Sequence, residues 1–305
     1  MSMRKIILCS VASVSMGLVH AGVIEDHIQN TLKETSGVTA KNIQVGPVSG
    51  LYSFQLQEAP GTFYIDEKAR FVILMRKTPF VLPGASDGVT KEEEFSQKIS
   101  QELRSRVKDV AQSPVRQLVS FRVDGIGDVL YADKQATVIF PAMQIVDLKT
   151  KVNYTEERML ELGKQDWLSF PREGAIKQVY GKGERRVVVF SDANCGYCRQ
   201  LEQTWRQVGN ITVYTFIVPL IRGRKNNREI VCSKNPTQAW HDWMSNHILP
   251  TDMKPGVCTA EELNRNYQFA MSHGITGAPS IFFPSGLRIS GAMPAAMLEQ
   301  ALSLE

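Results

Sequence analysis

The stretch Arg186–Cys198, RVVVFSDANCGYC, decides the fold of the second half of the chain. Residues 186–190 hold four consecutive apolar side chains, which is typical of a buried central strand. The stretch ends in a Cys-x-x-Cys pair, and a helix-compatible run over 199–208 and a second apolar strand over 211–218 follow it. This order predicts a β-α-β unit that carries the cysteine pair at its first strand-to-helix junction.

That junction favours thiol chemistry. Cys195 lies at the start of the predicted helix, where free backbone N–H groups and the positive end of the helix dipole stabilise a thiolate and lower its pKa. Cys198 lies one turn further on and can attack a mixed disulfide formed on Cys195. We therefore predict that Cys195 is the nucleophile and Cys198 the resolving thiol. Two alternatives stay open: a zinc site, which needs a second pair of ligands, and an inert Cys195–Cys198 disulfide.

The remaining motifs of this half follow the β-α-β unit. Cys232 and Cys258 flank a helical run over 236–247, so we expect them to form a structural disulfide that staples a helical insertion. A second redox pair is the alternative reading of these two cysteines. Pro279 stands directly before a strand, a position suited to a cis peptide bond, which would expose backbone groups for an extended substrate beside the cysteine pair.

The N-terminus has the pattern of a secretory signal peptide. Arg4-Lys5 is followed by an uncharged run over 6–19, and the small residues Val19 and Ala21 stand at the −3 and −1 positions of a cleavage site. We expect segment 1–21 to be removed, which leaves an even number of cysteines in an oxidising compartment, simplest the bacterial periplasm. A lipoprotein anchored through Cys9 and a buried N-terminal helix are the alternatives.

The first half contains an internal repeat. Residues 61–73 align with 127–139 at an offset of 66, and residues 47–54 align with 114–121 at an offset of 67. A predicted helix precedes each copy, over residues 23–33 and residues 92–110. Each copy therefore predicts one helix followed by strands, and the alternative is that both are generic α+β pieces with similar turns.

Composition and patterning complete the plan of the chain. A formal net charge of +4 and 43% hydrophobic residues disfavour a nucleic-acid binder and a disordered chain. No later segment is apolar for long enough to span a membrane, so we expect a soluble protein. The plan has six parts: a signal peptide (1–21), module copy 1 (22–78), a linker (79–90), module copy 2 (91–148), a linker helix (149–170) and a catalytic domain (171–305).

With these residues in view, the chain resembles the DsbC-type periplasmic thiol:disulfide interchange proteins. The resemblance rests on FSDANCGYC at 190–198, on Cys232 and Cys258, and on Gly277-Ala-Pro279. It implies an α/β thioredoxin-like catalytic domain with a helical insertion. Before this domain it implies small α+β, cystatin-like modules, here apparently two in tandem, and a linker helix.

The resemblance also implies roles. It places the redox-active dithiol on Cys195 and Cys198, the structural disulfide on Cys232 and Cys258, and the cis-proline on Pro279. Substrate contacts would come from Gly196, Tyr197, Ala278 and Pro279. The implied activity is disulfide isomerisation or reduction on misoxidised or unfolded exported proteins, with a membrane thiol reductase of the DsbD type as partner and without a cofactor, a metal or nucleic acid. A dithiol oxidase and a periplasmic chaperone are the alternatives.

Two departures from the family pattern matter. Ala278 stands where the family commonly has Thr, which puts the redox potential in doubt. The family also usually has one N-terminal module, through which two chains form a homodimer, whereas this chain has two copies. We hypothesise that the copies pair within one chain to give a monomer, and a homodimer through either copy is the alternative.

Overall fold

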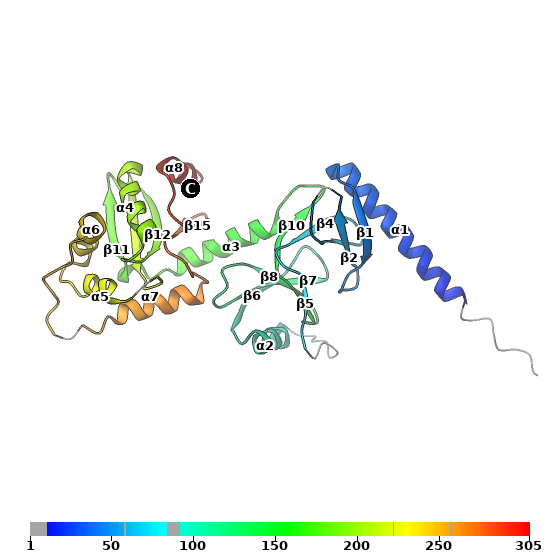
Figure 1. Cartoon of the computed structure of the whole chain (residues 1–305), viewed down its shortest axis with the longest axis horizontal. Helices are drawn as coiled ribbons and strands as arrows, with labels where there is room; N and C mark the ends of the chain where they lie inside the picture. Colours follow the sequence, from blue (N-terminus) through cyan, green and yellow to red (C-terminus); the bar gives the residue numbers. More distant parts are fainter. Residues whose placement is uncertain (1–10, 58, 84–91, 222, 257) are drawn as a thin grey trace, which may run out of the picture. The chain divides into compact units, whose positions relative to one another are not determined.

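The structure is a computed structural model that describes residues 11–57, 59–83, 92–221, 223–256 and 258–305 (Figure 1). Residues 1–10 of the predicted signal peptide, residues 84–90 of the predicted linker and residue 91 of the predicted second module lie outside this description. The chain divides into two compact units. Unit 1 comprises Met1–Phe121 and Val129–Glu156, and unit 2 comprises Arg122–Asp128 and Glu157–Glu305.

The first half of unit 1 is a helix and an antiparallel sheet. Its elements are α1 (Val11–Ser36), β1 (Ala40–Val45), β2 (Leu51–Leu56), β3 (Phe63–Asp66) and β4 (Phe71–Met75). Helix α1 buries Ile28 and Leu32 against Phe54 of β2 and Ile65 of β3. Gly37, with φ +67°, follows the helix and lets the chain turn into the sheet.

The second half repeats this order. Its elements are α2 (Glu92–Leu103), β6 (Val107–Gln112), β7 (Leu118–Val123), β8 (Leu130–Asp133) and β9 (Val138–Phe140). The prediction of a helix over residues 92–110 is therefore wrong at its end, because residues 107–110 belong to strand β6. Arg104 has φ +50° and ends the helix at the position equivalent to Gly37, and β6 begins three residues later.

The two copies are related by a constant offset of 67. Leu51 pairs with Asp66 in copy 1 and Leu118 with Asp133 in copy 2, and the rest of each hairpin follows the same register. The turns also agree, because Asp66 and Asp133 each accept backbone N–H bonds from the residues four and five positions later. The predicted offset of 66 between residues 61–73 and residues 127–139 is thus one residue too small.

The copies exchange their last strands. Strand β5 (Phe80–Val81) follows copy 1 but pairs with β9, and β10 (Ala142–Asp147) follows copy 2 but pairs with β4. The resulting sheets have the orders β1-β2-β3-β4-β10 and β5-β9-β8-β7-β6. Where the two connections cross, the Arg76 N–H donates to the Pro141 carbonyl at 3.1 Å. The exchanged strands therefore join the two halves of unit 1, and residues 80–81 of the predicted linker are a strand.

Unit 2 is built on a mixed sheet with the order β11-β13-β12-β14-β15. Its strands are β11 (Ile176–Tyr180), β12 (Arg185–Ser191), β13 (Ile211–Ile217), β14 (Ser280–Phe282) and β15 (Arg288–Ser290). Its helices are α4 (Gly196–Val208), α5 (Lys225–Val231), α6 (Pro236–Asn246), α7 (Glu261–Ser272) and α8 (Ala295–Leu302), with a short 3-10 turn over Arg172–Gly174. Strands β12 and β13 are parallel with α4 between them, which is the predicted β-α-β unit.

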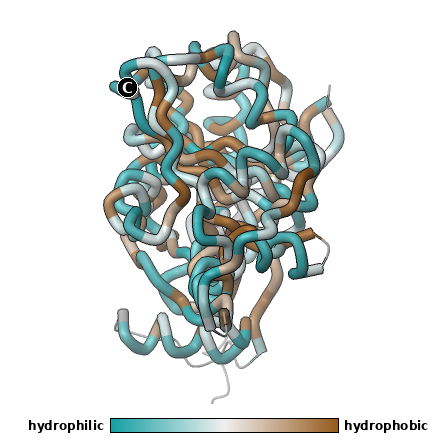
Figure 2. Tube along the Cα trace, turned by 90° about the vertical axis from the view of Figure 1, so that its left-hand side faces the viewer, coloured by the Kyte–Doolittle hydropathy of each residue, from teal (hydrophilic) through white to brown (hydrophobic). Residues whose placement is uncertain are grey.

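Strand β12 is central because both of its faces are covered. Val187 and Val189 pack with Trp205 of α4, and Val188 and Phe190 pack into an aromatic cluster on the other face. In Figure 2, hydrophobic stretches lie along the inner strands, whereas the outer helices alternate hydrophobic and hydrophilic residues. A strand that is buried on both faces explains the uninterrupted apolar run in the sequence.

Helix α3 (Tyr154–Ser169) occupies most of the predicted linker, residues 149–170. Its first residues belong to unit 1, where the Thr155 hydroxyl contacts the Tyr131 hydroxyl at 2.8 Å. From Glu157 onward it belongs to unit 2, where it buries Leu162. Across the described ranges, no helix has the length and the apolar character that crossing a bilayer requires.

Candidate active site

The cysteine pair lies where β12 passes into α4. Helix α4 begins at Gly196, so Cys195 is its N-cap residue, with extended backbone angles of φ −91° and ψ 118°. The Cys198 backbone N–H donates to Cys195 Sγ at 3.4 Å. The helix begins three residues earlier than the predicted run at 199, and as a result both cysteines lie in its first turn.

The two thiols differ in acidity. A hydrogen bond from the Cys198 thiol, together with the backbone N–H groups of Cys198 and Tyr197, lowers the pKa of Cys195 to about 6, against the opposing effect of burial. Burial raises the pKa of Cys198, and the neighbouring Cys195 raises it further. At neutral pH the pair therefore holds one thiolate, on Cys195, and one thiol, on Cys198.

A buried carboxylate holds the loop in front of the pair. Asp192 is fully buried, and its Oδ1 accepts the Asn194 N–H at 2.8 Å and an Asn227 Nδ2 hydrogen at 2.9 Å. Its Oδ2 accepts the Ile221 N–H at 2.8 Å. Three donors on one buried carboxylate compensate its loss of water and fix the backbone that leads to Cys195.

Helices α5 and α6 hold the same loop from the insertion. Asn227 of α5 accepts the Ala193 N–H at 2.9 Å, and the indole N–H of Trp243 in α6 donates to the Ala193 carbonyl at 2.6 Å. Asn226 also donates to the Asn194 side chain at 2.7 Å. Both backbone groups of Ala193 are thus bonded to side chains, which makes the insertion part of the active-site framework.

The Ala278–Pro279 peptide bond is cis and lies beside the cysteine pair. The Cys195 thiol, when protonated, donates to the Ala278 carbonyl at 3.3 Å. Beyond this bond, the Gly291 N–H donates to the Pro279 carbonyl at 2.8 Å and fixes the loop to β15. Gly196 and Tyr197, which follow Cys195, are exposed, Tyr197 with 68% of its surface accessible.

Cys232 and Cys258 form a disulfide with their Cα atoms 5.8 Å apart. The bond joins the end of α5 to the segment before α7, and α6 lies within the loop that it closes. Inside the insertion, buried Trp240 donates from its indole N–H to Glu202 of α4 at 2.9 Å. Burial raises the pKa of the Glu202 carboxyl, despite the hydrogen bonds it receives from Trp240 and Gln178.

The structure brings the residues singled out from the sequence to one place. Cys195, Cys198 and Cys232 belong to one buried cluster, with Cys258 and Ala278 packed against it. The reasoning from sequence did not identify the loop framework of Asp192, Asn227 and Trp243. Asp192 could have been found as an acid directly after a buried strand, but nothing in the sequence marks Asn227.

Comparison with known proteins agrees with this geometry. Residues 172–304 match the family model of a thioredoxin-like domain. The chain is 36% identical over 177 residues to a probable thiol:disulfide interchange protein DsbC of Bordetella pertussis, a match that covers 57% of this chain and 62% of the relative. A protein of the same name from Bordetella avium is 31% identical over 187 residues, covering 60% and 65%.

Among solved structures, a disulfide interchange protein from Neisseria gonorrhoeae is 29% identical. The match covers 44% of this chain and 97% of that one, with a TM-score of 0.41. The chain thus spans less than two thirds of the length of the curated relatives described above. The resemblance seen in the sequence is confirmed: residues 172–304 are a thioredoxin-like domain, and the chain is homologous to the thiol:disulfide interchange proteins named DsbC.

Proposed function

We propose that the chain is a thiol:disulfide interchange enzyme that isomerises or reduces disulfides in exported proteins through Cys195 and Cys198. The observation that carries the proposal is the contrast between the two thiols. Cys195 caps a helix with a pKa lowered to about 6, and the pKa of buried Cys198 is raised. An ionised thiol attacks a disulfide, whereas the protonated Cys198 thiol beside it is unreactive until the mixed disulfide has formed.

The reaction follows in two steps. The Cys195 thiolate attacks one sulfur of a substrate disulfide, whose S–S bond breaks and whose second sulfur leaves as a thiolate. In isomerisation, a substrate thiolate then attacks the substrate sulfur of the mixed disulfide, which forms a new substrate disulfide and releases Cys195 as a thiolate with no net transfer of electrons. In reduction, Cys198 loses its proton and attacks Cys195 Sγ, so the substrate leaves reduced and the enzyme holds a Cys195–Cys198 disulfide.

The surroundings of Cys195 suit a polypeptide substrate. The Ala278 carbonyl lies within hydrogen-bond distance of Cys195 Sγ, and the neighbouring Gly277 is exposed. An extended peptide that bonds to this loop would present its disulfide to the thiolate, as in strand addition. Exposed Tyr197 would supply an apolar contact next to the attacked bond.

The reductive arm needs a source of electrons, because each reduction leaves Cys195 and Cys198 oxidised. We propose a membrane thiol reductase of the DsbD type as this source and the periplasm as the compartment, reached through the cleaved segment 1–21. Both proposals draw on the similarity to DsbC and on the signal-peptide pattern of the sequence.

One observation favours a second candidate, a dithiol oxidase. A thiolate that is stabilised in the reduced enzyme makes the corresponding disulfide a stronger oxidant. The lowered pKa of Cys195 therefore serves oxidation as well as isomerisation. The two functions differ in the redox state of the cysteine pair: an isomerase is kept reduced in the cell, whereas an oxidase is kept as the Cys195–Cys198 disulfide.

Reactivation of a scrambled multi-disulfide protein tests the proposal. We expect residues 22–305 to restore its activity in the presence of catalytic glutathione, the Cys195→Ala variant to lose this effect, and Cys198→Ala to retain part of it. Reactivation that is unchanged in Cys195→Ala contradicts the proposal. Fast oxidation of a reduced substrate by the disulfide form, without reactivation, would support the oxidase instead.

A further inference from the structure

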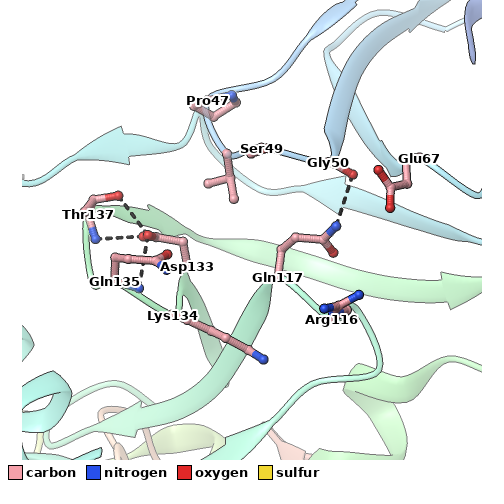
Figure 3. A pocket seen from close by; sticks show the side chains of 11 residues that line it. Pro47, Ser49, Gly50, Glu67, Arg116, Gln117, Asp133, Lys134, Gln135 and Thr137 are labelled. Carbon is pink, nitrogen blue, oxygen red and sulfur yellow. Dashed lines mark hydrogen bonds between the residues drawn. The ribbon is translucent and has the colours of Figure 1, made fainter. Parts of the chain in front are cut away.

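Within unit 1, two residues that are equivalent in the repeat meet each other. Gly50 and Gln117 precede the equivalent strands β2 and β7, and each accepts the same backbone bond. The Glu67 N–H donates to the Gly50 carbonyl at 3.0 Å, and the Lys134 N–H donates to the Gln117 carbonyl at 3.3 Å. The Gln117 side chain in turn donates to the Gly50 carbonyl at 3.4 Å (Figure 3). Because equivalent residues meet only near a two-fold axis, this contact marks an approximate two-fold axis between the copies.

An open cavity of about 620 Å³ surrounds this contact, and both copies line it. Copy 1 contributes the turn 47–50 and Glu67, and copy 2 contributes Arg116, Gln117 and the turn that begins at Asp133 (Figure 3). The exchanged strands β5 and β10 bind the same two copies to each other. The cavity is thus part of the interface between the copies, and the residues around it show how well the two faces match.

The two copies place residues of different size at the axis, Gly50 in copy 1 and Gln117 in copy 2. Gly50 has φ +80°, and a Cβ atom built on it would lie 2.4 Å from Gln117 Nε2, closer than such atoms approach. A side chain at residue 50 would therefore require the end of the Gln117 side chain to shift, and the positive φ of Gly50 also favours glycine at this position. Two copies of the second kind, placed face to face, would bring two Gln117 side chains into the space that holds one.

The two faces also differ in charge. Glu67 of copy 1 is equivalent to Lys134 of copy 2, and Ser49 is equivalent to Arg116, and all four residues line the cavity. The pairing in this chain therefore sets Glu67 of copy 1 against Arg116, Lys134 and Asp133 of copy 2. Two second copies would instead gather two Arg116 and two Lys134 in one cavity. Two first copies would bring two Glu67 together with Lys68 and Arg70, the equivalents of the lining residues Gln135 and Thr137. Like charges that face each other across an interface therefore disfavour the pairing of two second copies in particular.

We propose that this face is a matched interface, specific for the other copy in the same chain, and that the protein is consequently a monomer with one catalytic unit. The inference goes beyond the proposed function and does not depend on thiol exchange. Its partner is internal: Gly50 and Glu67 line the cavity together with Gln117 and Lys134, and a second Gln117 and Lys134 in their place would add both bulk and positive charge. Because the exchanged strands close within one chain, pairing needs no second chain and gains from the high effective concentration of a tethered partner.

A cross-link between exchanged strands tests whether pairing is internal. Leu74 of β4 and Gln144 of β10 are directly paired, and directly paired strand residues lie within the Cα distance that a disulfide spans. We would make Leu74→Cys with Gln144→Cys in a Cys195→Ala, Cys198→Ala background, oxidise the full chain and run it without reductant. The control is Lys41→Cys with Gln55→Cys, an exposed pair within copy 1 that cross-links inside one chain in either arrangement.

We expect a covalent monomer from both variants and a native mass near 34.1 kDa, less any cleaved segment, for the wild-type chain. A covalent dimer from Leu74→Cys, Gln144→Cys alone would show that β10 pairs with β4 of a second chain. That result, or a native mass of twice the chain, would overturn the proposal.

Charge reversal tests the match itself. Glu67→Lys gives copy 1 the charge of copy 2, so we expect a lower denaturation midpoint for unit 1 than in Glu34→Lys, an exposed change of the same sign outside the cavity. Adding Lys134→Glu restores one acid and one base, and we expect the midpoint to recover. If Glu67→Lys behaves like Glu34→Lys, or if the double variant is weaker than Glu67→Lys alone, the faces are not matched by charge and the proposal fails.

Discussion

At the scale of single residues, the chemistry depends on the different surroundings of two thiols three positions apart. Cys195 caps the helix and receives N–H groups, whereas Cys198 lies three residues later in the first turn; both side chains are buried. The thiol of Cys198 is the first cause of the lowered pKa of Cys195, ahead of the backbone N–H groups. The helix start alone therefore does not account for the acidity of Cys195.

This order of causes predicts a pH profile. We expect the alkylation rate of Cys195 in the reduced chain to rise with pH with a midpoint of about 6. In Cys198→Ala the midpoint should move upward, because the hydrogen bond from the Cys198 thiol is lost. Measuring the rate with a small alkylating reagent, with peptide mapping to confirm the site, checks both statements. A midpoint near the ordinary thiol value in the wild type, or one that does not move in Cys198→Ala, would contradict the account.

The same pKa predicts a pH dependence of stability. The pKa of Cys195 is lower in the folded chain than in the unfolded chain, so between these values the unfolded state binds more protons. The free energy of unfolding should therefore rise as the pH increases from about 6 toward the unfolded thiol pKa of about 8.5. Denaturant titrations of the reduced chain should show this rise relative to Cys195→Ala. Parallel pH profiles of the two proteins would count against it.

The loop framework gives a third prediction. Asn227→Leu removes one donor to the buried Asp192 and leaves the Ala193 N–H without its acceptor. Unsatisfied buried groups cost about 1–3 kcal/mol each, so we expect a loss of stability in this range together with slower thiol exchange. Asn226→Leu is the matched control, since it removes one bond at a partly exposed position and should have a smaller effect. Equal losses of stability in the two variants would show that Asn227 is no more important to the loop than Asn226.

At the scale of elements, the patterns that rest on burial could be predicted and those that rest on long-range pairing could not. The run at 186–190 revealed strand β12 because both of its faces are buried. The end of helix α2 was missed because residues 104–110 are compatible with a helix, and only pairing in the sheet makes them a strand. The offset of 66 came from chance identities, two of them between residues of strands β4 and β9, whereas strand pairing requires 67.

The insertion of α5 and α6 gives a prediction at this scale. Its disulfide closes a loop over a sequence separation of 26, for which chain entropy gives about 3–4 kcal/mol of stabilisation. We expect Cys232→Ala with Cys258→Ala to lose about this much unfolding free energy in denaturant titrations, and thiol exchange to slow because Trp243 and Asn227 position the active-site loop. An undiminished free energy of unfolding would show that packing alone holds the insertion.

At the scale of the whole molecule, we propose that unit 1 is a pseudo-dimer formed within one chain. Two copies of a small module exchange strands β5 and β10 within one chain, and a single thioredoxin-like domain follows them. The duplication was visible in the sequence, but the exchange was not, because β5 holds only two residues and lies in a segment rich in proline and glycine. The structure thus shows which strands pair. The differences in size and charge between the two copies support the proposal that they pair within one chain.

The most direct test of the central claim is to trap the mixed disulfide. The Cys198→Ala variant of residues 22–305, reduced and mixed with a scrambled multi-disulfide protein, lacks the thiol that releases the substrate by reduction. We predict a covalent complex with the substrate, linked through Cys195 in peptide mass spectrometry, dissolved by dithiothreitol and absent from Cys195→Ala. A complex linked through Cys232 or Cys258, or one that forms equally in Cys195→Ala, would show that Cys195 is not the attacking thiol.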